Sequence, residues 1–231
     1  MLKLNRRPRF ITFDCYGTLV QWHSALQNAV RTILAETTSV SIVDESQVTD
    51  TVEALRTVSM EQQQRSPFRD YKTILRSSLS EVMARKGLST EAIDGKTLLA
   101  CLRSIPPHPE VPAALERLRS RYRLAIISNT DDDLISGTVA ALGVPIHSVI
   151  TAQQAGAYKP NHQLFRHAHR VLGVIPEETV HVGMGQVTDL KVCQEMGIRA
   201  VWINRLGETL NPSWTPDAVL PDLTDLPEFL T

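Results

Sequence analysis

The chain has 231 residues, with 24 lysines and arginines against 25 aspartates and glutamates, and its formal net charge is -1. Apolar residues make up 42% of it and charged residues 21%, which are ordinary proportions for a globular protein and exclude disorder as the main state. The balanced charge leaves no basic excess for nucleic acid or an anionic membrane surface, so neither is expected as a partner.

The cysteines and the apolar runs narrow the class of protein further. Cys15, Cys101 and Cys193 are an odd number, widely spaced and without a CxxC pair, which favours neither a disulfide framework nor a structural zinc site. Apolar runs stay far below the ~20 residues of a membrane-spanning helix, and the N-terminal residues lack the pattern of a signal peptide. We therefore expect a reduced, cytoplasmic protein.

The first part of the chain predicts one strand and then a series of helices. A nearly apolar run over residues 10–13 is typical of a strand buried on both faces. No convincing strand follows until after residue 104. Within that stretch, apolar residues at helical spacing predict helices over residues 25–35, 48–64, 71–85 and 91–102.

From about residue 110 onward, helical and strand-like segments alternate. Helices are expected over residues 109–121, 131–142, 162–172 and 189–196, and strands over 124–127, 148–150, 180–182 and 200–203. Such alternation predicts an α/β fold with a doubly wound, Rossmann-like parallel sheet. We expect a core domain made of residues 1–20 and 105–231, with an all-helical domain, residues 21–104, inserted after the first strand.

Polar residues follow the ends of four of the predicted strands. Asp14 follows the first strand, Ser128 and Asn129 the second, Lys159 the third and Asp189 the fourth. Individually these are typical of a turn, a helix cap, a solvated lysine and a first-turn carboxylate. Because parallel strands place their carboxyl ends at one edge of the sheet, where ligands bind in open α/β sheets, together they indicate a single site.

In this order and spacing the residues resemble the haloacid dehalogenase (HAD) superfamily of hydrolases. The resemblance covers nearly the whole chain: the segment Asp14-Cys15-Tyr16-Gly17-Thr18, then Ser128, then Lys159 before a proline, then Asp189. It implies that the helical insertion is the superfamily's cap domain.

Two positions separate the branches of that superfamily. Its phosphatases carry a second aspartate as general acid where this chain has Tyr16, and a carboxylate that helps to hold Mg²⁺ where this chain has Met184. A thioether is a poor ligand for a hard cation. The segment around Asp14 instead resembles the metal-free L-2-haloacid dehalogenases, as does the run from Val201 to Arg205, so no cofactor is expected.

The resemblance implies a role for each residue at the sheet edge. Asp14 would attack the α-carbon of a small 2-substituted carboxylic acid, displace halide and form an ester, and Lys159 would keep Asp14 ionised. Asp189 would position the hydrolytic water.

The remaining candidates would contact the substrate. Ser128 and Thr18 would bind its carboxylate or orient Asp14, and Asn129 would donate toward the leaving group. Tyr16, Gln186, Trp22 and Arg56 complete the substrate-binding candidates.

This chain also departs from the dehalogenase pattern. The water-positioning loop is Met184-Gly185-Gln186 in place of Ser-Ser-Asn, Phe165 replaces a tyrosine, and either Arg56 or Arg65 would be the cap arginine that binds halide. Three alternatives therefore stand beside dehalogenation. They are ring opening of a strained cyclic amino acid such as azetidine-2-carboxylate, a Mg²⁺-dependent phosphatase, and a catalytically silent protein that binds a small acid or a partner. Relatives are often homodimers, so a homodimer is expected as well.

Overall fold

The structure is a computed structural model that describes residues 7–38, 42–88, 95–103 and 105–230. These residues pack into two compact units. The core unit takes in the described residues of Met1–Gln21, Pro106–Asn129 and Val139–Thr231, and the helical unit those of Trp22–Ile105 and Thr130–Thr138.

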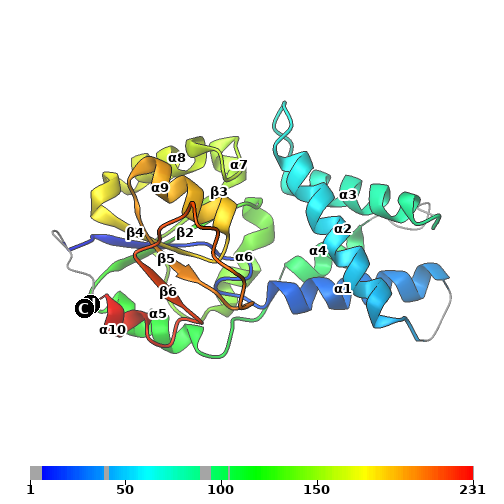
Figure 1. The fold of residues 1–231 in the computed structure, drawn as a ribbon, viewed down its shortest axis with the longest axis horizontal. Helices are drawn as coiled ribbons and strands as arrows, with labels where there is room; N and C mark the ends of the chain where they lie inside the picture. The colour runs from blue at the N-terminus through cyan, green and yellow to red at the C-terminus, as the bar shows by residue number, and fades with distance from the viewer. Residues whose placement is uncertain (1–6, 39–41, 89–94, 104, 231) are drawn as a thin grey trace. The chain divides into compact units, whose positions relative to one another are not determined.

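A parallel six-stranded sheet forms the centre of the core unit, in the order β3-β2-β1-β4-β5-β6 (Figure 1). The strands are β1 (Phe10–Phe13), β2 (Arg123–Ser128), β3 (Ser148–Thr151), β4 (Thr179–Gly183), β5 (Arg199–Ile203) and β6 (Ala218–Leu220). The predicted α/β fold with a parallel sheet is confirmed. The strand β6 was not predicted; it lies at the edge of the sheet and its residues are half-buried or exposed, unlike the buried central strands.

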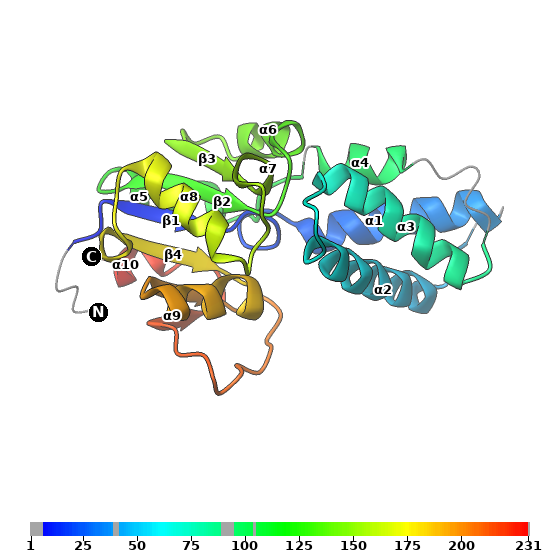
Figure 2. The same ribbon diagram turned by 90° about the horizontal axis from the view of Figure 1, so that it is seen from above.

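Helices cover both faces of this sheet (Figures 1 and 2). The helices α8 (His162–Leu172) and α9 (Val192–Met196) lie on one face, and α5 (Val111–Arg119) and α10 (Leu226–Phe229) on the other. Covering both faces explains why the central strands are apolar runs: every residue of β1 and of β4 is buried.

Three short elements complete the connections of the core unit. These are the helix α7 (Ala152–Ala155), the 3₁₀ turn η1 (Pro176–Glu178) and the π-helical turn η2 (Gln186–Lys191). The strand order reverses between β1 and β4, and in doubly wound sheets the crevice at such a point, at the carboxyl ends of the strands, is where ligands bind. The segment after β1 and the turn η2 after β4 both begin there.

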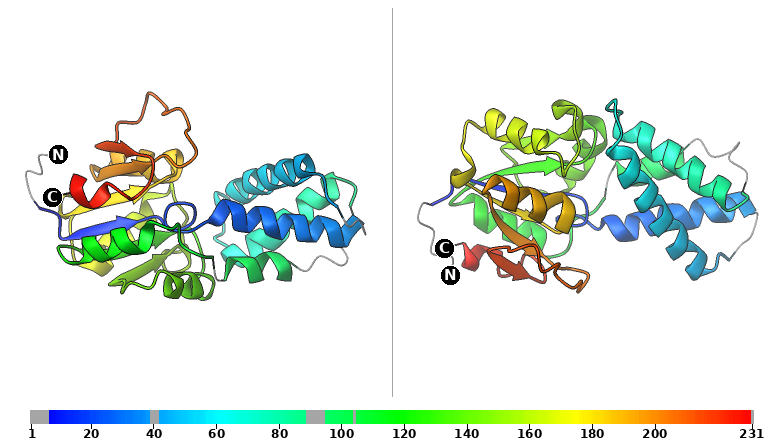
Figure 3. Two further views of the ribbon diagram at one scale, coloured as in Figure 1. Left: turned by 90° about the horizontal axis from the view of Figure 1, so that it is seen from below. Right: turned by 45° about the horizontal axis from the view of Figure 1, so that its top comes forward.

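The helical unit consists mainly of α1 (Trp22–Thr38), α2 (Glu45–Gln63), α3 (Tyr71–Arg85) and α4 (Lys96–Leu102). α1 packs on α2 and on α4, and α2 packs on α3 (Figure 3). The predicted helix over 91–102 is present from Lys96, and its first four residues lie outside the described residues. None of the helices that the structure describes combines the length and the apolar content needed to cross a bilayer.

The segment after β2 belongs partly to the helical unit. The carboxylate of Asp131 accepts the backbone N–H groups of Tyr71 and Lys72 at 2.8 and 2.9 Å and so caps the start of α3. The helix α6 (Asp132–Ala141) therefore begins in the helical unit and ends in the core unit, whereas the sequence analysis placed residues 131–142 wholly in the core. The other unit boundaries lie after Gln21 and after Ile105, where the expected boundaries lay after residues 20 and 104.

Candidate active site

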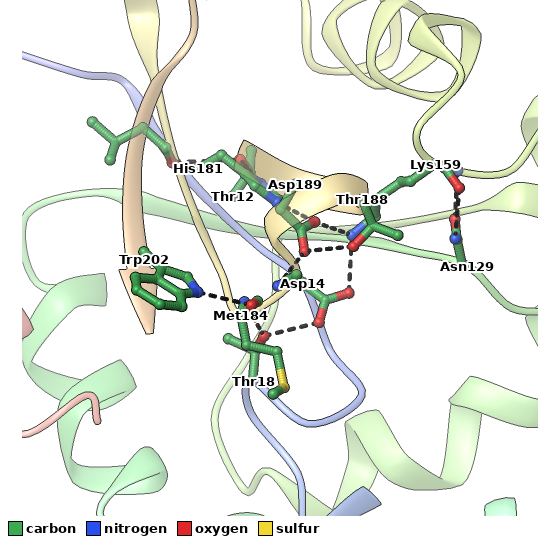
Figure 4. A network of polar contacts seen from close by, with 12 residues as sticks. Thr12, Asp14, Thr18, Asn129, Lys159, His181, Met184, Thr188, Asp189 and Trp202 are labelled. Atoms are coloured by element: carbon green, nitrogen blue, oxygen red, sulfur yellow. Dashed lines mark hydrogen bonds and ion pairs between the residues drawn. The ribbon is translucent and has the colours of Figure 1, made fainter. Parts of the chain in front are cut away.

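Asp14 lies directly after β1, where the strand order reverses. Its backbone N–H donates to the carbonyl of Val182 at 2.9 Å, so this residue is still paired with β4. Gly17 has a φ of 88°, which glycine adopts without strain, and the tight turn there brings Thr18 back toward Asp14. The Thr18 hydroxyl donates to Asp14 Oδ2 at 2.8 Å (Figure 4).

Lys159 links Asp14 to Asp189. Its Nζ lies 2.9 Å from Asp14 Oδ1 and 2.7 Å from Asp189 Oδ1 (Figure 4). The side chains of Lys159 and Asp189 are only 1% and 2% exposed, whereas that of Asp14 is 14% exposed. We call these three residues the charge triad; within it, Asp14 is the member that a ligand can reach.

The carboxylate of Asp189 accepts four hydrogen bonds. Oδ1 receives Lys159 Nζ and, at 3.1 Å, the imidazole Nε2 of His181. Oδ2 receives the backbone N–H of Gly185 at 3.0 Å and the hydroxyl of Thr188 at 3.1 Å. A carboxylate offers about four lone-pair positions, so Asp189 is fully engaged within the protein.

Two glycines make this arrangement possible. A Cβ at Gly183 would lie 2.7 Å from Asp189 Cγ, and one at Gly185 would lie 1.9 Å from Thr188 Oγ1 and 2.7 Å from Asp189 Oδ2. The π-helical turn η2 folds the Asp189 carboxylate back against the end of β4, and only residues without a side chain leave room for it.

The pKa values of the three side chains of the triad are shifted to different extents. Burial lowers the pKa of Lys159, but the two carboxylates outweigh it and raise the pKa above its usual value, so the ammonium stays charged. Burial raises the pKa of Asp189, yet Lys159 and His181 hold it well below the usual range. Burial raises the pKa of Asp14 above its usual value; Lys159 opposes this and Asp189 adds to it. As the pH falls, Asp14 is therefore the first of the two carboxylates to gain a proton.

Three further predicted residues lie around the triad. Thr18 orients Asp14 and accepts the backbone N–H of Met184 at 3.0 Å. The side-chain amide of Asn129 accepts the N–H of Lys159 at 2.7 Å and donates to its carbonyl at 3.2 Å, so Asn129 fixes the backbone of the lysine. Ser128 is buried at the end of β2, and its hydroxyl has no hydrogen-bond partner within the described protein.

Two other candidates in the core unit are placed differently. Tyr16 is half-buried in the loop after β1, where its backbone pairs with Val20. Gln186 uses its amide in the loop after β5: it donates to Glu208 and to the carbonyl of Thr209 and accepts the N–H of Asn211 at 2.8 Å. Among the described residues, the amide of Gln186 thus bonds to this loop and not to Asp14.

Trp22 and Arg56 belong to the helical unit, which is described by itself. They line a pocket of that unit whose walls include Leu26, Leu55 and Leu75. The guanidinium of Arg56 lies 5.7 Å from the centre of the Trp22 ring, a cation–π arrangement. Among the described residues Arg56 has no ion-pair partner.

The sequence analysis missed several residues that support the triad. His181 and Thr12 are polar positions within the otherwise apolar runs of β4 and β1, and that contrast was the available signal. Arg205 donates to the carbonyl of Thr18 at 2.8 and 3.1 Å, and Trp202 Nε1 donates to the carbonyl of Met184 at 2.9 Å. These contacts join residues that are far apart in the sequence, so a local sequence pattern cannot predict them.

The donor set does not fit a resident magnesium ion. Mg²⁺ needs a near-octahedral set of oxygen ligands, but both carboxylates of the triad face the Lys159 ammonium, and Asp189 has no free acceptor position. Met184 offers a thioether where the resemblance to phosphatases would require a carboxylate. In the part of the chain that the structure describes, no three His, Cys, Asp or Glu side chains are grouped to hold a metal ion.

Comparison with known proteins identifies the family. A family model described as haloacid dehalogenase-like hydrolase matches residues 8–197. The chain therefore belongs to the haloacid dehalogenase-like hydrolases, as the order of Asp14, Ser128, Lys159 and Asp189 predicted.

The relatives within that family include both dehalogenases and phosphatases. (S)-2-haloacid dehalogenase 4A from Burkholderia cepacia is 26% identical over 211 residues, which cover 90% of this chain and 88% of that protein. A solved L-2-haloacid dehalogenase structure superimposes with a TM-score of 0.80 at 26% identity and covers 96% of this chain and 98% of its own. Phosphoserine phosphatase from Thermus thermophilus is 33% identical, but over 127 residues, and the match spans only about half of either protein, 54% of this chain and 51% of the phosphatase.

Proposed function

We propose that this protein hydrolyses a small 2-substituted carboxylic acid without a metal ion, converting an (S)-2-haloacid to the 2-hydroxy acid. The observation that carries this proposal is the charge triad: an accessible Asp14 carboxylate bonded to Lys159, in a donor set that fits Mg²⁺ poorly. The near full-length similarity to (S)-2-haloacid dehalogenases supports it.

In the first step, a carboxylate oxygen of Asp14 attacks the α-carbon of the substrate. The new C–O bond forms an ester as the carbon–halogen bond breaks, and halide leaves with the bonding electron pair. Halide needs no proton, so the reaction does not require a general acid at Tyr16. Lys159 balances the charge of Asp14 before the attack.

In the second step, water attacks the carbonyl carbon of the Asp14 ester. The bond from that carbon to the ester oxygen breaks, the 2-hydroxy acid leaves with an oxygen that came from Asp14, and one proton passes to solvent. The Lys159 ammonium contacts Asp14 Oδ1 at 2.9 Å and the Thr18 hydroxyl contacts Oδ2 at 2.8 Å. The donor on the oxygen that remains the carbonyl oxygen of the ester stabilises the negative charge that develops there.

We assign Asp189 to Lys159 and not to the water. The resemblance implied that Asp189 positions the hydrolytic water, but a carboxylate that already accepts four hydrogen bonds would have to give one up to do so. As a buried, permanently ionised group it holds the ammonium in place.

The substrate carboxylate is assigned to Ser128. Buried polar groups in proteins are almost always paired, and the Ser128 hydroxyl lacks a partner at the end of the strand beside β1. Trp22 and Arg56 stay predictions as contacts of the leaving group; within the helical unit, Arg56 is a guanidinium without an ion-pair partner among the described residues and lines a pocket together with Trp22.

The test is an assay of the purified protein with (S)-2-chloropropionate, its (R)-enantiomer and azetidine-2-carboxylate, measuring halide and amine release. We expect halide release from the (S)-enantiomer, unchanged by EDTA, and no hydrolysis of p-nitrophenyl phosphate with added Mg²⁺. Asp14→Asn is the inactive control. Phosphate release that EDTA abolishes would overturn the proposal in favour of a phosphatase, amine release would redirect it to ring opening, and no turnover of any substrate would favour a binding protein.

A further inference from the structure

His181 lies between β1 and the charge triad. It is a fully buried residue of β4. Its Nδ1 lies 2.9 Å from the hydroxyl of Thr12 and its Nε2 lies 3.1 Å from Asp189 Oδ1 (Figure 4). The edge of its ring meets the Phe165 ring at a centroid distance of 4.9 Å and an angle of 79°, which fixes the plane of the imidazole.

One tautomer satisfies both contacts. The ionised Asp189 carboxylate can only accept, so the hydrogen of a neutral imidazole must be on Nε2. Nδ1 is then an acceptor for the Thr12 hydroxyl at 2.9 Å, a shorter contact than the 3.4 Å from that hydroxyl to the carbonyl of Val180. When a hydrogen bond requires one ring nitrogen to carry the hydrogen, the other nitrogen of the neutral ring must be unprotonated.

The surroundings keep the imidazole neutral. Burial lowers the pKa of His181 and outweighs the hydrogen bond and charge of Asp189, which raise it; Lys159 lowers it further and Asp14 raises it. On the side of α8, His169 is also a buried imidazole with a lowered pKa, through burial and the proximity of the His181 ring, which Glu177 opposes. The charged groups that act on His181 are thus the three members of the triad.

We propose that His181 is a positioning residue: a neutral donor, whose tautomer is set by the Asp189 carboxylate, that holds Asp189 so that the Lys159 ammonium stays directed at Asp14. Asp189 and Lys159 are bonded through the same oxygen, Oδ1, that His181 contacts. A change at His181 therefore alters the geometry of the ammonium without touching a ligand at Asp14.

The direct test does not depend on turnover. Long-range proton–nitrogen NMR spectra of the full-length protein labelled with ¹⁵N-histidine report the tautomer of His181, assigned with His181→Gln. We expect the neutral form protonated on Nε2 throughout pH 5.5–9, and the same tautomer with a shifted Nδ1 resonance in Thr12→Val, which removes the hydroxyl beside Nδ1. A ring that titrates near its usual pKa of about 6.5, or one protonated on Nδ1, would overturn the proposal.

Kinetics test the positioning role, which rests on the proposed function for its assay. In His181→Leu we expect kcat for halide release to fall by about 10²-fold, as for a small misplacement of a reacting group, with KM within twofold and the acid limb of the pH profile moved to higher pH. His181→Gln, which keeps a donor, should recover most of kcat. A folded His181→Leu with the kcat and pH profile of the wild type, or a Gln variant as impaired as Leu, would contradict the role.

His169→Leu is the matched control, because His169 is a buried histidine that contacts a threonine, Thr179 at 3.4 Å, and no member of the triad. We expect it to lower the melting temperature without moving the pH profile. If His181→Leu does not fold, kcat and the pH profile are measured on Thr12→Val instead, which removes the hydroxyl that contacts His181 Nδ1. If the wild type releases no halide, the proposed function fails, while the tautomer spectra still decide the role of His181.

Discussion

At the scale of single residues, one ammonium serves two carboxylates. Lys159 contacts both Asp14 and Asp189. Because four donors stabilise the negative charge of Asp189, the negative charge of Asp14 is the less stabilised of the two. An acid whose folded-state pKa is raised contributes stability below its unfolded-state pKa, and this is lost as the pH rises through the folded-state pKa. At neutral pH the ionised nucleophile is therefore a stability cost, as is common at active sites.

The first prediction concerns Asp14→Asn. Turnover should be abolished, since an amide cannot form the ester, while the melting temperature at pH 7 should equal or exceed that of the wild type, because a neutral side chain removes the buried negative charge and leaves the Lys159–Asp189 pair intact. Thermal unfolding of both proteins, with halide release, measures the two effects. A marked loss of stability would show that Asp14 is a structural ion-pair partner instead.

The second prediction is the pH dependence of turnover. The carboxylate form of Asp14 is the reactive form, so kcat/KM should fall on the acid side through a pKa above the ordinary aspartate value of about 3.9. Because the pKa values of His169 and His181 are lowered, neither should produce a limb near pH 6.5. A profile flat down to pH 4 would contradict the raised pKa of Asp14.

The third prediction concerns Ser128→Ala. If the hydroxyl binds the substrate carboxylate, its loss removes a hydrogen bond to a charged group, about 1.5–3 kcal/mol, which raises KM by roughly 10- to 100-fold with a smaller effect on kcat. Stability should change little, because the hydroxyl has no partner among the described residues of the free protein. Steady-state kinetics with (S)-2-chloropropionate give the answer, and an unchanged KM would exclude Ser128 from substrate binding.

At the scale of elements, the connection from β4 into η2 sets the geometry of the site. The backbone of Gly185 donates to Asp189, and both Asp189 and Leu190 donate their N–H groups to the Gly185 carbonyl, at 2.9 and 3.1 Å. Wider π-helical turns of this kind are frequent at functional sites. In this chain the Met184-Gly185-Gln186 segment thus packs against the Asp189 carboxylate.

The fourth prediction compares two glycines. Gly185→Ala places a Cβ 1.9 Å from Thr188 Oγ1, so η2 must shift and Asp189 with it, and we expect kcat to fall by about 10²-fold. Gly197→Ala is the control: Gly197 has a φ of 68° and open space around it, so alanine there should cost about 1–2 kcal/mol of stability and leave kcat unchanged. Equal activities of the two variants would show that η2 tolerates displacement.

At the scale of the whole molecule, the sequence predicted the sheet and the residues at its edge better than their connections. Nearly apolar runs predicted five of the six strands. The residues that follow three of these strands meet in the triad, because parallel strands end at one edge of the sheet; they are Asp14, Lys159 and Asp189. The strand β6, at the edge of the sheet and without a buried residue, was not predicted.

The unit boundaries and the hydrogen-bond partners of the site residues depend on tertiary contacts, which a local sequence pattern does not predict. The capping of α3 by Asp131 assigns residues 130–138 to the helical unit. Residue spacing likewise could not predict that Asn129 bonds to the Lys159 backbone, or that Gln186 bonds to the loop after β5. Residue type predicted which groups gather at the sheet edge, and the structure shows which of them contact one another.

The most direct test of the account is a single turnover in ¹⁸O-labelled water, with excess enzyme over (S)-2-chloropropionate. If Asp14 forms the ester, the first product carries unlabelled oxygen from its carboxylate, and mass spectrometry of the recovered protein finds one ¹⁸O in the peptide that contains Asp14. Labelled product and an unlabelled peptide would show that water attacks the substrate directly, and would contradict the role of Asp14 as the nucleophile.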